Sequence, residues 1–218
     1  TYGKFICQPL EKGYGLTIGN SLRRILLSSI QGPAITKVKI DGVQHEFSTI
    51  TGVKEDVTEI ILNLKKLNLK MNTYDPQIIS LSYEGEGEVT AKDIETNQNV
   101  EIVNDHQFIA TLSESAKLDI EMTVEMGRGY MPTESRDENN HSIGEILVDS
   151  IFSPVLKVNY NVTAARVGRR TDYERLTIEV WTNGTVFPED AVAYGAKILK
   201  DQMSVFVNFD EEEIDAIP

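Results

Sequence analysis

Hydrophobic positions spaced by three and four residues predict a helix near each end of the chain. The first spans 20–30, ends before Gly32-Pro33, and carries one stripe of Leu22, Ile25, Leu26 and Ile30. Leu27 falls beside that stripe and Arg24 roughly opposite Leu22. The apolar arc is therefore about 200° wide, whereas a single buried face needs only about 100°.

The second helix begins at Pro188, a residue suited to a first helical turn. Its apolar positions are spaced 4, 3, 4, 3, as in a coiled-coil seam: Val192, Ala196, Leu199, Met203 and Phe206. The same spacing also fits the core helix of a monomer. Two over-apolar helices at opposite ends of one chain favour the alternative, a helical dimer interface.

Between these helices the period is mostly two, which is typical of strands. Along residues 34–40 the side chains of two opposite strand faces alternate, and Asp41-Gly42 follows directly. This pattern predicts a hairpin whose second strand is Val43–Phe47. Residues 118–126 predict a strand with one core face and one largely acidic face, and Leu176–Trp181 another that ends at a hairpin-type turn, Asn183-Gly184. An internal helix is expected over Glu55–Leu64. The order helix, strands, helix indicates an α+β fold.

Composition narrows the class of protein. The 218 residues include 34 Asp and Glu against 21 Lys and Arg, a formal charge of −13 that disfavours direct nucleic-acid binding. No apolar run approaches the roughly 18 residues that a membrane span needs, and no leader marks the chain for secretion. The single cysteine, Cys7, fits a reducing compartment and is expected to be a buried small hydrophobe.

The sequence carries few residue patterns typical of catalytic or metal sites. His45, His106 and His141 are scattered, and with one cysteine they effectively exclude a structural zinc site. No nucleophile elbow, P-loop or calcium loop is present, and no acidic pair suggests a general acid and base. We therefore expect no metal, no cofactor and no catalytic residue.

One segment leaves an enzymatic alternative open. Gly13, Gly15 and Gly19 precede the first predicted helix, where glycines could cradle a pyrophosphate, so a nucleotide- or NAD(P)-binding enzyme stays the second hypothesis. The spacing misses the dinucleotide motif by one residue, and the preceding 8–12 is not a buried parallel strand. The simpler interpretation is a tight turn that sets the angle of the helix.

Basic residues stand out on this acidic background. They are a solvated face with internal ion pairs or a surface that docks another protein: Arg128, Arg166, Arg169, Arg170 and Arg175. The polar stretch Thr133–Ser142 is expected to be an exposed loop. The tail 210–218 is expected to be an acidic, structure-poor run like the start of a linker.

Several blocks resemble the bacterial DNA-directed RNA polymerase α-subunit family in its N-terminal domain. The most specific is LEKGYGLTIGNSLRRILLSS, residues 10–29. Others are Ile40–Ser48, Gly52–Leu64, Gly127–Tyr130, Ser153-Pro154, Tyr160-Asn161, Ala164–Val167, Arg170–Asp172 and Thr182–Thr185. The resemblance runs through essentially the whole chain.

The resemblance implies a discontinuous dimerisation subdomain, with two interface helices and a sheet, formed by 1–31 and 158–210. A strand-rich subdomain, 32–157, would be inserted into it, and 211–218 would begin the linker. It implies a non-catalytic, cytoplasmic and nucleoid-associated assembly subunit of a nucleotidyltransferase. Its homodimer would dock the catalytic β and β′ subunits, and ω and σ indirectly, without binding DNA or a membrane.

Residue roles follow from the same resemblance. Arg24 and Leu27 match positions that hold β, and Lys65, Val148 and Val155 match positions that hold β′. The dimer interface would use Leu22, Ile25, Leu26, Ile30, Val192, Ala196, Leu199, Met203 and Phe206. The loop at Asp137-Glu138 is left open as an activator contact.

Two departures from the family pattern are expected to matter. Phe187 replaces an acidic cap, so the last helix should be less well capped. The chain also begins close to the glycines, without the family's opening strand region. The resemblance also implies that the chain ends in the linker, before the family's C-terminal DNA-binding module, so we expect no DNA contact by these residues.

Overall fold

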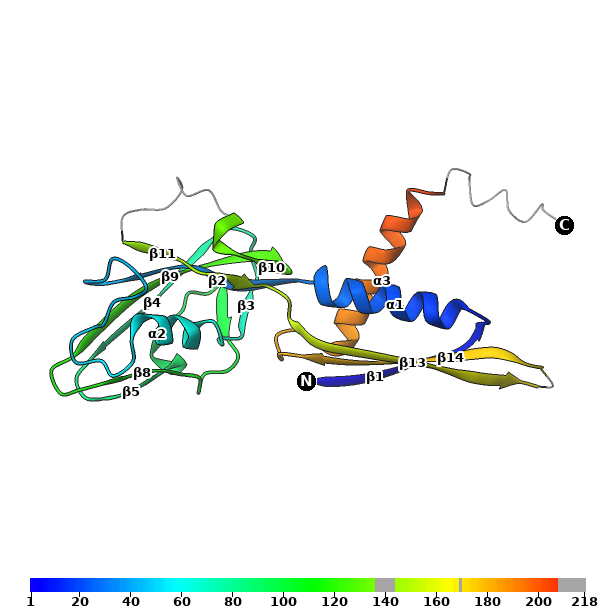
Figure 1. Cartoon of the computed structure of the whole chain (residues 1–218), viewed down its shortest axis with the longest axis horizontal. Coiled ribbons are helices and arrows are strands. Elements are labelled where there is room, and N and C mark those ends of the chain that lie inside the picture. Colours follow the sequence, from blue (N-terminus) through cyan, green and yellow to red (C-terminus); the bar gives the residue numbers. More distant parts are fainter. Residues whose placement is uncertain (136–143, 169, 208–218) are drawn as a thin grey trace. The chain divides into compact units, whose positions relative to one another are not determined.

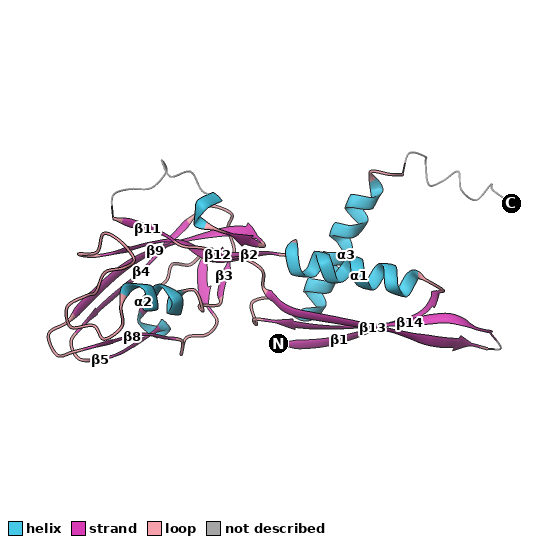
Figure 2. Ribbon diagram, viewed as in Figure 1, coloured by secondary structure: helices cyan, strands magenta, loops and turns pink. Residues whose placement is uncertain are grey.

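The computed structural model describes residues 1–135, 144–168 and 170–207 (Figure 1). Helices and strands are mixed along the chain, which confirms the predicted α+β class (Figure 2). The α-helices are α1 Tyr14–Ser28, α2 Val57–Leu64 and α3 Pro188–Ser204, and Ala91–Asp93 and Thr133–Ser135 form short 3₁₀ turns. The strands are β1 Tyr2–Glu11, β2 Gln31–Ile40, β3 Leu69–Met71, β4 Gln77–Glu84, β5 Gly87–Thr90, β6 Ile94–Glu95, β7 Val100–Ile102, β8 Phe108–Leu112, β9 Lys117–Arg128, β10 Tyr130–Met131, β11 Glu145–Leu147, β12 Ser150–Ile151, β13 Val155–Val167 and β14 Arg170–Thr182.

The chain divides into two compact units, which are described separately. Unit 1 comprises Thr1–Ile30, Val155–Trp181 and the segment that begins at Phe187. Unit 2 comprises Gln31–Pro154 and Thr182–Val186.

Unit 1 is a three-stranded sheet with helices on one face. The strand order is β1-β14-β13, and α1 contacts both β13 and α3 (Figure 1). Period-two alternation on β14 places Leu176, Ile178 and Val180 on one buried face. Leu22 and Leu26 of α1 are also buried, so this face of the sheet and the inner side of α1 form the core of the unit.

Unit 2 is built on a five-stranded sheet in the order β11-β2-β9-β4-β6. Strand β9 confirms the alternating segment, because its even-numbered residues from Leu118 to Val124 are buried. Helix α2 confirms the internal helix: Asp56 caps it by accepting from the N–H of Glu59 at 2.7 Å, and Val57, Ile60, Ile61 and Leu64 are buried in the core. The two-stranded ladders β3–β7, β5–β8 and β10–β12 complete the unit.

Both predicted hairpins are wrong, for one reason. Gly42 does take the positive φ of a turn, 77°, but 43–47 form no strand, because β9 and β11 already occupy both edges of β2. Likewise β1 and β13 occupy both edges of β14. The Asn183 carboxamide oxygen instead accepts from the N–H of Thr185 at 3.0 Å, in a turn that precedes α3.

The expected absence of an opening strand is also wrong. Residues 2–11 form β1, which pairs antiparallel with β14 in the register Phe5↔Ile178. β1 lies at the edge of its sheet, and most of its side chains are exposed. Cys7 lies on this strand and is exposed, so the expectation that it is buried fails for the same reason.

Candidate protein-docking surfaces

Two of the three glycines that precede the predicted start of the first helix lie inside the observed helix. Helix α1 begins at Tyr14, six residues before the predicted start at Asn20, and Gly13 is its N-cap with φ 93°. Gly15 and Gly19 are buried, and a Cβ on Gly19 would stand 2.7 Å from Cδ2 of Tyr160 on β13. Gly15 and Gly19 therefore let helix and strand approach closely, so the tight-turn interpretation is correct only for Lys12-Gly13, which form a turn directly before the helix.

The first turn of α1 is already bonded to a carboxylate of the chain. The N–H of Gly15 donates to Oε2 of Glu174 on β14 at 2.9 Å. An anion bound at this helix terminus would need such N–H groups and would meet the negative charge of Glu174. No observation on the described residues favours the nucleotide-binding alternative.

The two residues expected to hold β lie on the outer side of α1. Arg24 is exposed, and its guanidinium makes no hydrogen bond or ion pair with a described residue. Leu27 is half-buried. The neighbouring Arg23 is different, because its Nε donates to the carbonyl of Val158 at 3.3 Å. Both arginines are exposed, but only the guanidinium of Arg24 makes no hydrogen bond to a described residue.

The predicted dimer residues fall into two groups. Leu22, Leu26 and Ile30 are buried within the chain, and Ile25 is half-buried. On α3, Val192 and Leu199 are half-buried and Ala196 is exposed, whereas Met203 is 56% and Phe206 79% exposed. Phe206 lies just beyond α3, which ends at Ser204.

Helix α3 contacts α1 through small residues. Ala191 and Gly195 are its buried positions besides Pro188, and a Cβ on Gly195 would stand 3.1 Å from Cδ2 of Leu26. Tyr194 and Met203 of α3 are instead more than half exposed. Phe187 precedes the helix without a capping side-chain bond, which confirms the expectation of a poorer cap.

The residues expected to hold β′ have unequal exposure. Lys65 is exposed at the end of α2, but Val148 and Val155 are buried, at 3% and 5% exposure. Val148 lies in unit 2, and its N–H donates to the carbonyl of Thr36 at 3.0 Å, while Val155 begins β13 in unit 1. As the chain stands, Lys65 alone of the three presents its side chain to solvent.

Sequence reasoning missed a group beside Lys65. The N–H of Thr133 donates to the Asp149 carboxylate at 2.8 Å. This bond is the main cause that lowers the pKa of Asp149; the charge of Lys65 also lowers it, and partial desolvation opposes them. Desolvation first, and then the Asp149 charge, raises the pKa of Tyr130. We call Lys65, Tyr130, Met131, Asp149 and Ile151 the β10–β12 surface.

This surface combines charge with exposed apolar area. Tyr130 and Ile151 are directly opposite each other on β10 and β12, and they are 59% and 64% exposed. No periodicity predicts it, because each strand has only two residues. The only sequence signal nearby is Arg128 between two glycines.

Residues 38–153, a little more than half of the chain, match the family model described as the RNA polymerase Rpb3/RpoA insert domain. The chain belongs to the RNA polymerase α-subunit family. It is 60% identical to a DNA-directed RNA polymerase subunit alpha of Maridesulfovibrio salexigens over 96% of this chain and 61% of that protein. It is 58% identical to the protein so named in Lawsonia intracellularis and 56% to that of Geobacter metallireducens, over 97% of this chain and 61% and 62% of theirs. The chain thus spans about three fifths of the length of these curated relatives.

The other arginines of this α-subunit family member are only partly described. Arg166 is exposed and its Nε donates to the carbonyl of Gly168 at 2.7 Å, and Arg175 is half-buried. Arg128 faces Gln31, whose side-chain oxygen, when turned toward it, accepts from Nε and Nη2 at 2.9 Å each. Arg169, the Arg170 side chain, Asp137-Glu138, most of the Thr133–Ser142 loop and the tail 210–218 lie outside the described residues.

Over the residues that the structure describes, no three His, Cys, Asp or Glu side chains are grouped to hold a metal ion. Among the helices in the described ranges, none has both the length and the apolar character to cross a bilayer.

Proposed function

We propose that this chain is a non-catalytic assembly subunit of DNA-directed RNA polymerase, acting as a homodimer that holds the β and β′ subunits in the cytoplasm. The observation that carries the proposal, besides family membership, is a set of apolar side chains on α1, on α3 and directly after α3 that the chain itself leaves uncovered. Tyr14, Leu16, Tyr194, Met203, Val205 and Phe206 are each more than half exposed. Exposed apolar side chains of this number favour a protein partner.

Unit 1 is the dimerisation subdomain in this proposal. The exposed Met203 and Phe206, with the half-buried Val192 and Leu199, make the contact across the dimer, and Ala196 lets the helices approach. The buried Leu22, Leu26 and Ile30 make no direct dimer contact and instead hold α1 and α3 in place. Ile25 is intermediate, because it is half-buried. Unit 2 is the inserted subdomain.

The β and β′ contacts lie on different parts of the chain. Arg24 and Leu27 hold β, because Arg24 offers an unpaired guanidinium beside a half-buried leucine. Lys65 holds β′ from the β10–β12 surface. Val148 and Val155, being buried, support the backbone of their own units, unit 2 and unit 1 respectively, rather than meet the partner.

Two measurements on the purified chain test this proposal. Light scattering should give about twice the 24.4 kDa chain mass. Capture of β should be roughly 30-fold weaker for Arg24→Ala, since an interface arginine contributes ~2 kcal/mol. Arg166→Ala, an exposed arginine of the same unit, should bind β like the wild type.

The β′ contact is tested in parallel. Lys65→Ala should weaken β′ capture by the assembled α–β complex, whereas its exposed neighbour Lys66→Ala should not. A chain that dimerises but captures neither large subunit would refute the polymerase role. A chain that stays monomeric would refute the dimer platform itself.

A further inference from the structure

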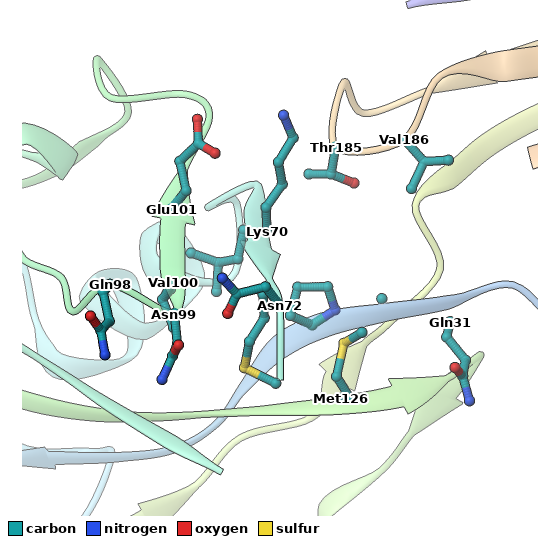
Figure 3. Close-up of a pocket in the computed structure, with 14 residues that line it drawn as sticks. Gln31, Lys70, Asn72, Gln98, Asn99, Val100, Glu101, Met126, Thr185 and Val186 are labelled. Carbon is teal, nitrogen blue, oxygen red and sulfur yellow. The ribbon is translucent and has the colours of Figure 1, made fainter. Parts of the chain in front are cut away.

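A groove of about 440 Å³ lies within unit 2 (Figure 3). One wall is formed by β3 and the neighbouring β7, and the other by Thr185 and Val186, which precede α3. The floor is largely apolar and includes Pro33 of β2 and Met126 of β9. This volume is within the range of about 300–1,000 Å³ typical of ligand sites.

The wall formed by β3 is an unpaired strand edge. Strands β3 and β7 pair in the register Leu69↔Ile102 to Met71↔Val100. At the two ends of this pair, the N–H of Val103 donates to the backbone carbonyl of Asn68 and the N–H of Asn72 to the backbone carbonyl of Asn99. Because antiparallel pairs alternate, the peptide groups of Lys70 face β7, and those of Leu69 and Met71 face away from it. Within the described residues, β3 pairs with no strand except β7, and no backbone hydrogen bond engages that second edge.

The groove is held open by bonds at one end. Nδ2 of Asn68 donates to the carbonyl of Asn183 at 3.2 Å, which fixes the 182–186 segment to the start of β3. The N–H of Asn183 in turn donates to the carbonyl of Pro154 at 3.0 Å. A site fixed in this way costs less conformational entropy on binding than one that must first be ordered.

A lysine in the groove favours a ligand that carries a negative charge. Lys70 is half-buried, and its ammonium makes no hydrogen bond or ion pair with a described residue. The acidic lining residue is Glu101, directly opposite Lys70 on β7. Figure 3 shows the Lys70 ammonium on the side of Thr185 and the Glu101 carboxylate on the β7 side. An acidic group above the open edge would therefore meet Lys70.

We propose that this groove binds an extended segment of a partner polypeptide, which adds a strand to β3 and carries an acidic side chain toward Lys70. Leu69 is only 2% exposed, so the peptide groups of the half-buried Met71 are the accessible part of this edge, and their donor and acceptor match those of another backbone in extended form. Alternate apolar side chains of the segment pack on Pro33, Met126 and Val186. The edge of β3, three residues or about 10 Å long, matches about three residues of the partner.

The test uses the full chain and a blocked hexapeptide in which valine alternates with threonine and one central aspartate. Addition of the peptide should shift the amide resonances of Leu69 and Met71 and, because only Met71 is accessible beforehand, slow the hydrogen exchange of Met71 about tenfold at saturation. Two forms of the peptide, N-methylated at the odd or at the even residues, separate strand addition from apolar contact. One form should lose binding, because it lacks the donors that face β3.

The charge contact has its own control. Lys70→Gln should lower the affinity for the aspartate peptide about threefold and leave the affinity for its asparagine analogue unchanged, as expected for a partly exposed ion pair. Lys54→Gln, an exposed lysine elsewhere in unit 2, should change neither. Equal binding of both methylated forms, or shifts confined to other residues, would overturn the proposal. Concentration-dependent shifts at Leu69 and Met71 without peptide would overturn it in favour of a second copy of the chain.

Discussion

The carboxylate of Glu174 accepts a hydrogen bond from the N–H of Gly15, with 2.9 Å between Oε2 and N. It thus joins β14 to the first turn of α1, where Gly13 has no side chain to cap the helix. A carboxylate at this end also interacts favourably with the helix dipole. The residue that stabilises the helix is therefore far from it in sequence.

Glu174→Ala should destabilise the chain by about 1 kcal/mol, the typical cost of a lost N-terminal cap. Glu174→Gln keeps a hydrogen-bond acceptor but loses the charge, so its free energy of unfolding should lie between those of Glu174→Ala and the wild type. Urea unfolding measures both. An unchanged midpoint for Glu174→Ala would show that water replaces the carboxylate at no cost.

Gly19→Ala should destabilise the chain although alanine is the better helix former. The added Cβ would stand 2.7 Å from Tyr160 and 2.9 Å from Leu176, and overpacking of this kind costs about 1–3 kcal/mol. Asn20→Ala, exposed on the same helix, should instead be neutral or stabilising by about 0.5 kcal/mol. Thermal unfolding of the two variants compares them directly, and a stabilised Gly19→Ala would contradict the close packing.

Local pattern was sufficient to predict the class of the fold and the elements with one clear buried face. Helix α2 and strand β9 follow from their periodicity alone. The local pattern was not sufficient where pairing between distant strands determines the structure. Asp41-Gly42 is a sound local turn signal, but the sequence around it cannot show that β9 and β11 occupy both edges of β2. Strand β1 was missed because an edge strand with exposed side chains has little hydrophobic pattern.

The candidate surfaces show the same division. The apolar surplus predicted at the last helix is present, since Met203 and Phe206 are exposed. On the first helix none of the predicted apolar residues is exposed, and the exposed Tyr14 and Leu16 lie before its predicted start. The sequence could not separate Met203 and Phe206 from Leu22 and Leu26, since all lie on helical stripes and only packing against the sheet distinguishes them. The pairing of Tyr130 with Ile151 and the open edge of β3 depend on contacts across the chain, so no local pattern predicts them.

Asp149 should make stability depend on pH. Its pKa in the folded chain is below the ordinary value of 3.8, so ionised Asp149 contributes stability above that value. The contribution disappears as pH falls through the lower, folded pKa. Asp149→Asn should therefore be less stable than wild type near neutral pH, by under about 1 kcal/mol at this partly exposed site, and the two should converge on acidification. Urea midpoints from about pH 7 to pH 3 test this, with Asp75→Asn as a charge-matched control. A gap that persists at acid pH would assign the effect to something other than ionisation.

Met203→Glu should dissociate the proposed dimer without unfolding the chain. Met203 is 56% exposed in the single chain, so a carboxylate there keeps its hydration and costs little. Across a dimer contact the same charge would be desolvated without a partner, a penalty of several kcal/mol. We expect dimer affinity to fall at least 100-fold, or by ~3 kcal/mol, with the measured mass near 24.4 kDa and the circular dichroism unchanged. Leu156→Glu, at a 66% exposed position on β13 of the same unit, should stay dimeric. If Met203→Glu remains a dimer while Leu156→Glu dissociates, the two copies meet through the sheet and not through α3.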